Sequence, residues 1–159
     1  MKTGFKPLHQ SVQKHLLGMI GERIVASYLR KSGCDVEESL NVFDSEKDLL
    51  VDGYKCEVKT QVPIMIEDSF AISTRQRGKI MDSHRVYWIS VPLKLYDELA
   101  GCVFEMDPRD ETLKGYRWTT HSGREAICFP RRQTAMKLLF KIEDSAILEQ
   151  LRELSTSYL

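Results

Sequence analysis

Two hydrophobic periodicities divide the first part of the chain into a helix and a set of strands. From about His15 onward, apolar residues recur every three or four positions, which is the spacing of one face of a helix. The helix should end at Gly33, because glycine readily adopts the left-handed backbone that follows many helices. The predicted inner face consists of Leu16, Leu17, Ile20, Ile24, Tyr28 and Leu29.

A β-hairpin is predicted in the stretch DLLVDGYKCEVK, residues 48–59. Asp52-Gly53 favours a two-residue turn, and that turn fixes which residues lie opposite one another. The expected pairs are Val51 with Tyr54, Leu49 with Cys56, and Asp48 with Glu57. Because side chains alternate between the faces of a strand, one face holds the apolar Leu49, Val51, Tyr54, Cys56 and Val58. The other face holds Glu46, Asp48, Leu50, Lys55, Glu57 and Lys59.

Further segments complete an α/β core. CDVEESLNVF (34–43) and SFAIS (69–73) predict strands, and RVYWISVPL (85–93) predicts a buried strand. TRQRGKIMDS (74–83) predicts a helix opened by a Ser/Thr cap. The order α-β-β-β-(β)-α-β indicates an α+β sandwich with a mixed sheet flanked by helices.

The C-terminal part reads as a hairpin followed by helices. CVFEMD (102–107) and YRWTTHSGREAICFP (116–130) predict strands, with a turn at 121–123. RRQTAMKLLFKI (131–142) and DSAILEQLREL (144–154) predict closing helices capped at Thr134 or Ser145. No repeat or flexible linker divides the chain, so we expect a single domain over 1–159, with a core at about 14–92 and an elaboration at about 100–159.

The composition is that of a globular protein, with 42% apolar and 29% charged residues. Apolar stretches such as 86–93 are far shorter than the roughly 20 residues that cross a bilayer, so no membrane partner is expected. Polar residues interrupt the N-terminal segment 1–24, which lacks the apolar run of a secretory signal, and a cytoplasmic, intracellular location is expected. The cysteines show no CxxC spacing and read as reduced, structural thiols; they are Cys34, Cys56, Cys102 and Cys128.

Charge is unevenly distributed along a chain whose net charge is zero. Residues 1–31, 74–85 and 113–141 carry excess charges of +5, +3 and +6. Acidic segments at 32–54, 86–112 and 142–159 balance them. This pattern would give the protein one basic and one acidic face, or only an ordinary solvated surface. The zero net charge of the whole chain counts against a nucleic-acid partner.

The polar face of the hairpin suggests hydrolysis of a phosphodiester. Two carboxylates directly opposite each other repel, so Asp48 and Glu57 favour a cation between them, such as Mg²⁺ with Mn²⁺ as a substitute. Lys59, one step further along the same face, would orient a water or neutralise a phosphate. The plainer alternative is a solvent-exposed face on which Lys55 and Lys59 screen the two acids.

The arrangement resembles the PD-(D/E)xK nuclease superfamily, in particular archaeal Holliday-junction resolvases and small site-specific homing or restriction endonucleases. GMIGERIVASYLRKSGCDVEE is similar to the opening helix of that family, KDLLVDGYKCEVKTQ to its catalytic strands, and FAISTRQRGKIMDSHRVYWISVP to the elements that follow. The resemblance implies a restriction-endonuclease-like core, metal ligands at Asp48 and Glu57, and a catalytic lysine at Lys59. Glu22 would complete the site by holding a metal ion or a metal-bound water.

The resemblance also implies DNA as the partner, either branched or double-stranded, and a homodimer or homotetramer. Lys47 replaces the nominal proline of the motif, and the neutral chain continues for about sixty residues beyond the core, so both structure-specific and site-specific cleavage stay open. A non-catalytic nucleic-acid-binding module and a protein-interaction domain are the alternatives outside the enzyme class.

Candidate DNA-contacting residues fall into three groups. Arg23, Thr60 and Gln61 lie beside the catalytic positions. The start of the second helix contributes Ser73, Arg75, Gln76, Arg77 and Lys79, where free N–H groups also attract phosphate. The C-terminal part contributes Arg117, Arg124, Arg131 and Arg132.

Overall fold

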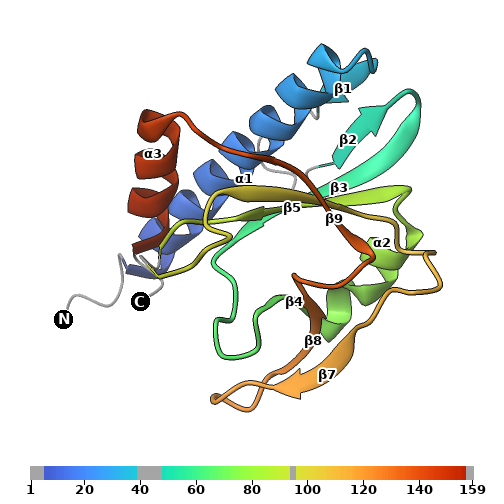
Figure 1. Cartoon of the computed structure of the whole chain (residues 1–159). Coiled ribbons are helices and arrows are strands. Elements are labelled where there is room, and N and C mark those ends of the chain that lie inside the picture. The colour runs from blue at the N-terminus through green and yellow to red at the C-terminus, as the bar shows by residue number, and fades with distance from the viewer. Residues whose placement is uncertain (1–5, 39–47, 94–95, 157–159) are drawn as a thin grey trace.

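The chain folds into three layers: helices, a six-stranded sheet and a smaller three-stranded sheet (Figure 1). The structure is a computed structural model, and it describes residues 6–38, 48–93 and 96–156. The large sheet has the order β1-β2-β3-β5-β6-β9 and the small sheet the order β4-β8-β7. Only β3 and β5 pair in parallel, and the other neighbours in both sheets are antiparallel. The predicted α+β sandwich with a mixed sheet is confirmed.

The strands of the large sheet are β1 (Val36–Glu38), β2 (Asp48–Val51), β3 (Tyr54–Gln61), β5 (Arg85–Ser90), β6 (Cys102–Met106) and β9 (Met136–Lys141). Those of the small sheet are β4 (Ser69–Ser73), β7 (Tyr116–Thr119) and β8 (Glu125–Pro130). The helices are α1 (Lys6–Lys31), α2 (Arg77–Asp82), α3 (Ser145–Ser155) and the short 3-10 helix η1 (Thr74–Gln76).

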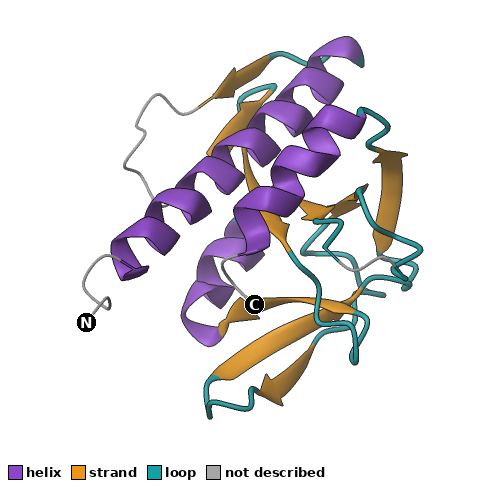
Figure 2. Ribbon diagram, turned by 90° about the vertical axis from the view of Figure 1, so that its left-hand side faces the viewer, coloured by secondary structure: helices purple, strands orange, loops and turns teal. Residues whose placement is uncertain are grey.

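Each face of the large sheet has its own hydrophobic core. Helices α1 and α3 lie side by side over one face (Figure 2), where Val25 and Leu151 meet Val58 and Ile89. The small sheet and α2 cover the other face, where Phe70 stacks on Trp88 with ring centroids 5.0 Å apart. Residues 102–156 supply members of both cores, so the segment expected to elaborate a finished core is part of it.

Helix α1 confirms the predicted periodicity but begins at Lys6, nine residues before His15. Leu17 and Leu29 are buried, whereas Leu16 is 43% exposed and does not belong to the inner face. Gly33 ends the helix as predicted, with φ of 96° and the Cys34 N–H donating to the Leu29 carbonyl at 3.0 Å.

The β2–β3 hairpin has the predicted register, with Val51 opposite Tyr54, Leu49 opposite Cys56, and Asp48 opposite Glu57. Asp52 and Gly53 both have positive φ, as the tight turn that matches strand twist requires. The one departure on the apolar face is Tyr54, which is 57% exposed and stacks on His84 instead of joining the core.

The strands predicted at 102–107 and 116–130 are confirmed as β6 and the β7–β8 hairpin, but the helix predicted over 131–142 is wrong. That segment forms a turn and then β9, which pairs with the edge of the sheet at β6. Its run Leu138-Leu139-Phe140 is a short apolar stretch that periodicity alone cannot assign, and a register shift between Val103 and Phe104 accommodates it.

The predicted caps are also corrected. Helix α3 is capped by Asp144, whose carboxylate accepts hydrogen bonds from two backbone N–H groups, and not by Thr134 or Ser145. Ser73 precedes η1, but its side chain makes no capping hydrogen bond. The four cysteines are free thiols, as expected. Among the described residues, no helix is long and apolar enough to cross a membrane.

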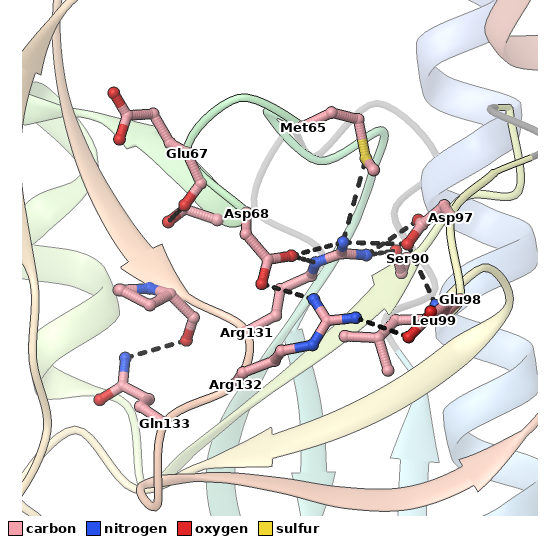
Figure 3. Close-up of polar contacts among 12 residues, drawn as sticks. Met65, Glu67, Asp68, Ser90, Asp97, Glu98, Leu99, Arg131, Arg132 and Gln133 are labelled. Atoms are coloured by element: carbon pink, nitrogen blue, oxygen red, sulfur yellow. Dashed lines mark hydrogen bonds and ion pairs between the residues drawn. The ribbon is translucent and has the colours of Figure 1, made fainter.

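Arg131 joins the two sheets from the inside (Figure 3), so its prediction as a DNA contact is wrong. Its side chain has no solvent exposure and donates to both carboxylate oxygens of Asp97, at 2.9 and 3.0 Å. It also donates to Asp68 at 2.6 Å and to Ser90 at 2.9 Å. These partners lie just before β4, at the end of β5 and before β6, so one guanidinium holds three chain segments together.

Helix α1 approaches β3 closely at Gly21. A Cβ atom there would lie 1.8 Å from Oγ1 of Thr60 and 3.1 Å from Ile89, so only glycine lets the helix sit at this distance. Three residues earlier, Gly18 has nothing within 4 Å of such an atom. The first helix is therefore placed by a backbone contact at one specific glycine.

Gly21→Ala should destabilise the protein by about 1–3 kcal/mol, because the methyl group overlaps Thr60 and the helix must shift. Gly18→Ala is the matched control and should raise the unfolding free energy by about 0.5–1 kcal/mol, because alanine favours the helix and meets no neighbour. Urea denaturation of both variants checks this, and equal stabilisation by the two substitutions would contradict the close contact.

The Asp68 carboxylate should make the stability of the fold depend on pH. Burial alone would raise the pKa of Asp68, but hydrogen bonds from Arg132 and Arg131 outweigh burial and hold the pKa below its usual value. The stabilisation is therefore present above about pH 4, the unfolded range for Asp, and is lost as pH falls through the lower folded pKa.

Asp68→Asn should lower the unfolding free energy at pH 7 by about 1–3 kcal/mol, and its difference from wild type should narrow below about pH 4. Glu98→Gln is the control, because Glu98 is exposed and meets only the outer Arg132, at 3.4 Å. It should change stability by less than about 0.5 kcal/mol. A gap for Asp68→Asn that does not change with pH would show that Asp68 stabilises the fold without its charge.

Candidate active site

Strand β3 carries the proposed catalytic residues on one face. Because side chains alternate, Glu57, Lys59 and Gln61 face the small sheet, while Val58 and Thr60 face the helices. Glu57 is only 2% exposed, although its strand neighbour in β5 is the apolar Val86. A carboxylate in such a position requires cationic partners, because burying an uncompensated charge is costly.

Two lysines supply these partners. Nζ of Lys59 lies 3.4 Å from Oε1 of Glu57, and Nζ of Lys79 lies 3.3 Å from Oε2. Lys59 comes from the same strand, and Lys79 comes from α2. The sequence predicted Lys79 as a contact to the DNA backbone, whereas the structure places it in the site against Glu57. The motif spacing identified Lys59, but nothing in the sequence linked Lys79 to this carboxylate.

Asp48 occupies the backbone position opposite Glu57 that the turn predicts. Its side chain lies outside the described part of the structure. Glu22 is 4% exposed on α1, and its neighbour Gly21 packs against Thr60. Helix α1 therefore carries Glu22 on the helix side of the large sheet, whereas Glu57 and Lys59 face the small sheet.

The donor set suits a hard divalent cation in part. Glu57 offers buried carboxylate oxygens, the ligand type that Mg²⁺ prefers, and two ammonium groups already converge on it. Among the described side chains, no three acidic, histidine or cysteine groups form a metal-binding cluster. The side chain of Asp48 is not included in that statement. A cation at this site would have Glu57 and Asp48 as its candidate protein ligands and would displace Lys79 from Oε2.

A basic cleft of about 570 Å³ begins at Lys59 and runs along the end of β3. Its walls come from α1, the β4–η1 junction, the β7–β8 turn and the end of α3. Its cations are Lys14, Lys59, Arg75 and Arg124, and none of the described lining residues is acidic. The other lining residues are Leu17, Thr60, Gln61, Val62, Ala71, Ile72, Ser73, Gln76 and Ser155.

The sequence anticipated much of this cleft. Among the predicted DNA-contacting residues, the structure brings together Thr60, Gln61, Ser73, Arg75, Gln76 and Arg124. Each of the three basic segments contributes one cation, namely Lys14 from 1–31, Arg75 from 74–85 and Arg124 from 113–141. Sequence reasoning missed Lys14, for which the excess positive charge of residues 1–31 was the available signal.

Gln61 has a structural task in addition to lining the cleft. Its side-chain amide donates to the Ala71 carbonyl at 2.9 Å, and its side-chain oxygen accepts from the Ala71 N–H at 2.7 Å. This pair works like one rung of a β-ladder between β3 and β4. It fixes the start of η1, and hence Arg75 and Gln76, relative to Lys59.

The remaining predicted contacts lie elsewhere. Arg23 lines a separate groove between α1, β9 and α3. Arg77 is exposed at the start of α2, outside the described cleft lining. Arg132 is half exposed and pairs with Asp68 at 2.6 Å, and Arg117 is 80% exposed, 4.0 Å from Glu125. The structure therefore divides the candidate arginines between a common cleft and scattered surface positions.

Comparison with known proteins finds no matching protein family, no matching curated protein and no matching solved structure. The case for the function of this site therefore depends on the geometry of β3 and its cleft, together with the resemblance of the sequence motifs.

Proposed function

We propose that this protein is a metal-dependent endodeoxyribonuclease that hydrolyses DNA phosphodiester bonds. The observation that carries the proposal is the buried Glu57, which lies opposite Asp48 in the hairpin and 3.4 Å from Lys59, at the mouth of a basic cleft whose described lining contains no acid. A polyanionic substrate is attracted to such a cleft, and a carboxylate pair with a lysine supplies the groups that phosphodiester hydrolysis needs.

Each residue has a distinct role in this reaction. Mg²⁺, when bound by Asp48 and Glu57, would supply Lewis-acid activation of the phosphate. Lys59 lies where its ammonium stabilises the negative charge that grows on the phosphate oxygens during attack. Glu22, which the sequence predicted to complete the site, lies on the helix side of the sheet and has no step in this reaction. Cutting both strands requires at least two copies of the chain, because one such site cuts one strand, so we propose a homodimer or homotetramer.

The second candidate function is a nucleic-acid-binding module without turnover. The observation that favours it is the ammonium group on each oxygen of Glu57, at 3.4 and 3.3 Å, which balances the charge of the carboxylate. A nuclease and a binding module share the cleft and differ in whether Glu57 and Lys59 are needed for cleavage.

Glu57→Gln and Lys59→Met should each reduce Mg²⁺-dependent DNA cleavage by about 10²-fold or more, because each removes a group that acts directly on the reacting phosphate. The assay uses supercoiled plasmid and a synthetic four-way junction, with Mg²⁺ and with EDTA. The two substrates also separate site-specific from structure-specific cleavage.

Glu149→Gln and Lys114→Met are the matched controls, since both residues are exposed and lie outside the described lining of the cleft. They should cleave at the wild-type rate. Thermal denaturation must show that the Glu57 and Lys59 variants are folded at the assay temperature. Wild-type protein that cleaves neither substrate, or active folded Glu57→Gln and Lys59→Met variants, would rule out the nuclease.

Lys79→Met should tighten the binding of Mn²⁺ by about tenfold, which corresponds to ~1.4 kcal/mol. The reason is that an ammonium 3.3 Å from Oε2 competes with a divalent cation for Glu57. Electron paramagnetic resonance of Mn²⁺, without DNA, measures the affinity independently of activity. Arg77→Met, from the same helix, is the control and should bind Mn²⁺ as wild type does; unchanged or weaker binding by Lys79→Met would exclude the competition.

A further inference from the structure

The cleft beside Lys59 gathers cations that have no acidic partner in the part of the chain that the structure describes. Among the described residues, no carboxylate lies within ion-pair distance of Lys14, Arg75 or Arg124, although all three line one cleft of about 570 Å³. The neighbouring candidates Arg117, Arg131 and Arg132 each pair with an acid. Like charges held together in this way repel, and a bound polyanion relieves that repulsion.

The backbone fixes where these cations stand. Ser73 of β4 pairs with Ala126 of β8, so η1, with Arg75, lies beside the β7–β8 turn, with Arg124. In that turn, the Arg124 N–H donates to Oγ1 of Thr120 at 3.0 Å, and the Thr120 N–H donates back to the Arg124 carbonyl at 2.8 Å. Lys14 reaches the cleft from α1. Three separate elements, α1, η1 and the β7–β8 turn, thus each contribute one cation to the same cleft.

The lining also contains apolar and neutral polar groups. Leu17, Val62 and Ile72 offer surface to a sugar or base, while Ser73 and Gln76 offer hydrogen-bonding side chains. A cleft of this volume is in the size range of small-molecule sites, so the occupant inferred for it is a short length of one backbone and not a whole duplex. Phosphate contacts from lysine and arginine position a strand without reading its sequence.

We propose that this cleft binds the phosphodiester backbone of one DNA strand, with Lys14, Arg75 and Arg124 as its phosphate contacts and Lys59 next to the bond that is cut. The placement of the cut bond rests on the proposed function, whereas strand binding does not. The strand comes either from unpaired DNA or from one backbone of a duplex or junction.

Fluorescence anisotropy in EDTA tests strand binding without turnover. The probes are a labelled single strand of about 15 nucleotides, the matched duplex and a four-way junction. Lys14→Gln, Arg75→Gln and Arg124→Gln should each weaken binding of the preferred probe by about tenfold and lower the salt dependence by about one phosphate contact. Comparison of the three probes identifies the source of the strand.

Lys114→Gln is the matched control, because Lys114 is exposed and lies outside the described cleft lining. It should bind within about twofold of wild type. The proposal would be overturned if the cleft variants bind as tightly as wild type, if Lys114→Gln shows an equal loss, or if an equimolar mononucleotide competes fully.

The outcome is separable from that of the nuclease. If the cleft variants bind DNA more weakly and the wild-type protein cleaves no substrate, strand binding is supported and the nuclease function is ruled out. If all three cleft variants cleave DNA with the KM of the wild type, the proposed strand binding in the cleft is excluded and the nuclease function is kept.

Discussion

The alternation of side chains along β3 is the constraint on which the other layers depend. This strand pairs with β2 on one side and β5 on the other. Thr60, on its helix face, meets Gly21 of α1, and Gln61, on its opposite face, bonds to Ala71 of β4. A slip of one residue would move Glu57 into the apolar core under the helices and turn Val58 toward the small sheet. The same register that packs the core therefore also places the candidate site.

The sequence predicted this strand well because its signals are local. The Asp52-Gly53 turn sets the hairpin register through backbone geometry alone, and the structure has that register. The helix predicted over 131–142 failed for the opposite reason. Whether Leu138-Leu139-Phe140 forms a helix or a strand depends on pairing with β6, which lies more than thirty residues earlier in the chain. Local periodicity holds no information about that partner.

The candidate site shows the same difference between features set by local sequence and features set by long-range packing. The spacing of Glu57 and Lys59 is visible in the sequence, and the clustering of Arg75 and Arg124 was anticipated only as separate basic segments. The contact between Lys79 and Glu57 depends on how α2 packs under the sheet. Arg131 was predicted as a DNA contact, yet Asp68 and Asp97, distant in sequence, make its burial possible.

Two buried charged side chains in this protein, Arg131 and Glu57, differ in how their ion-pair partners are held. Arg131 contacts two carboxylates and Ser90, and its hydrogen bonds join three chain segments. Loss of a carboxylate partner would leave the buried guanidinium charge without full compensation. Glu57 meets two lysines from different elements, Lys59 of β3 and Lys79 of α2, whose side chains are 18% and 19% exposed. Because these ion pairs involve side chains alone, exchanging a lysine for another cation breaks no backbone hydrogen bond. We propose that Glu57 exchanges these cations, next to a cleft with further cations and no described acid, as the proposed phosphodiester chemistry would require.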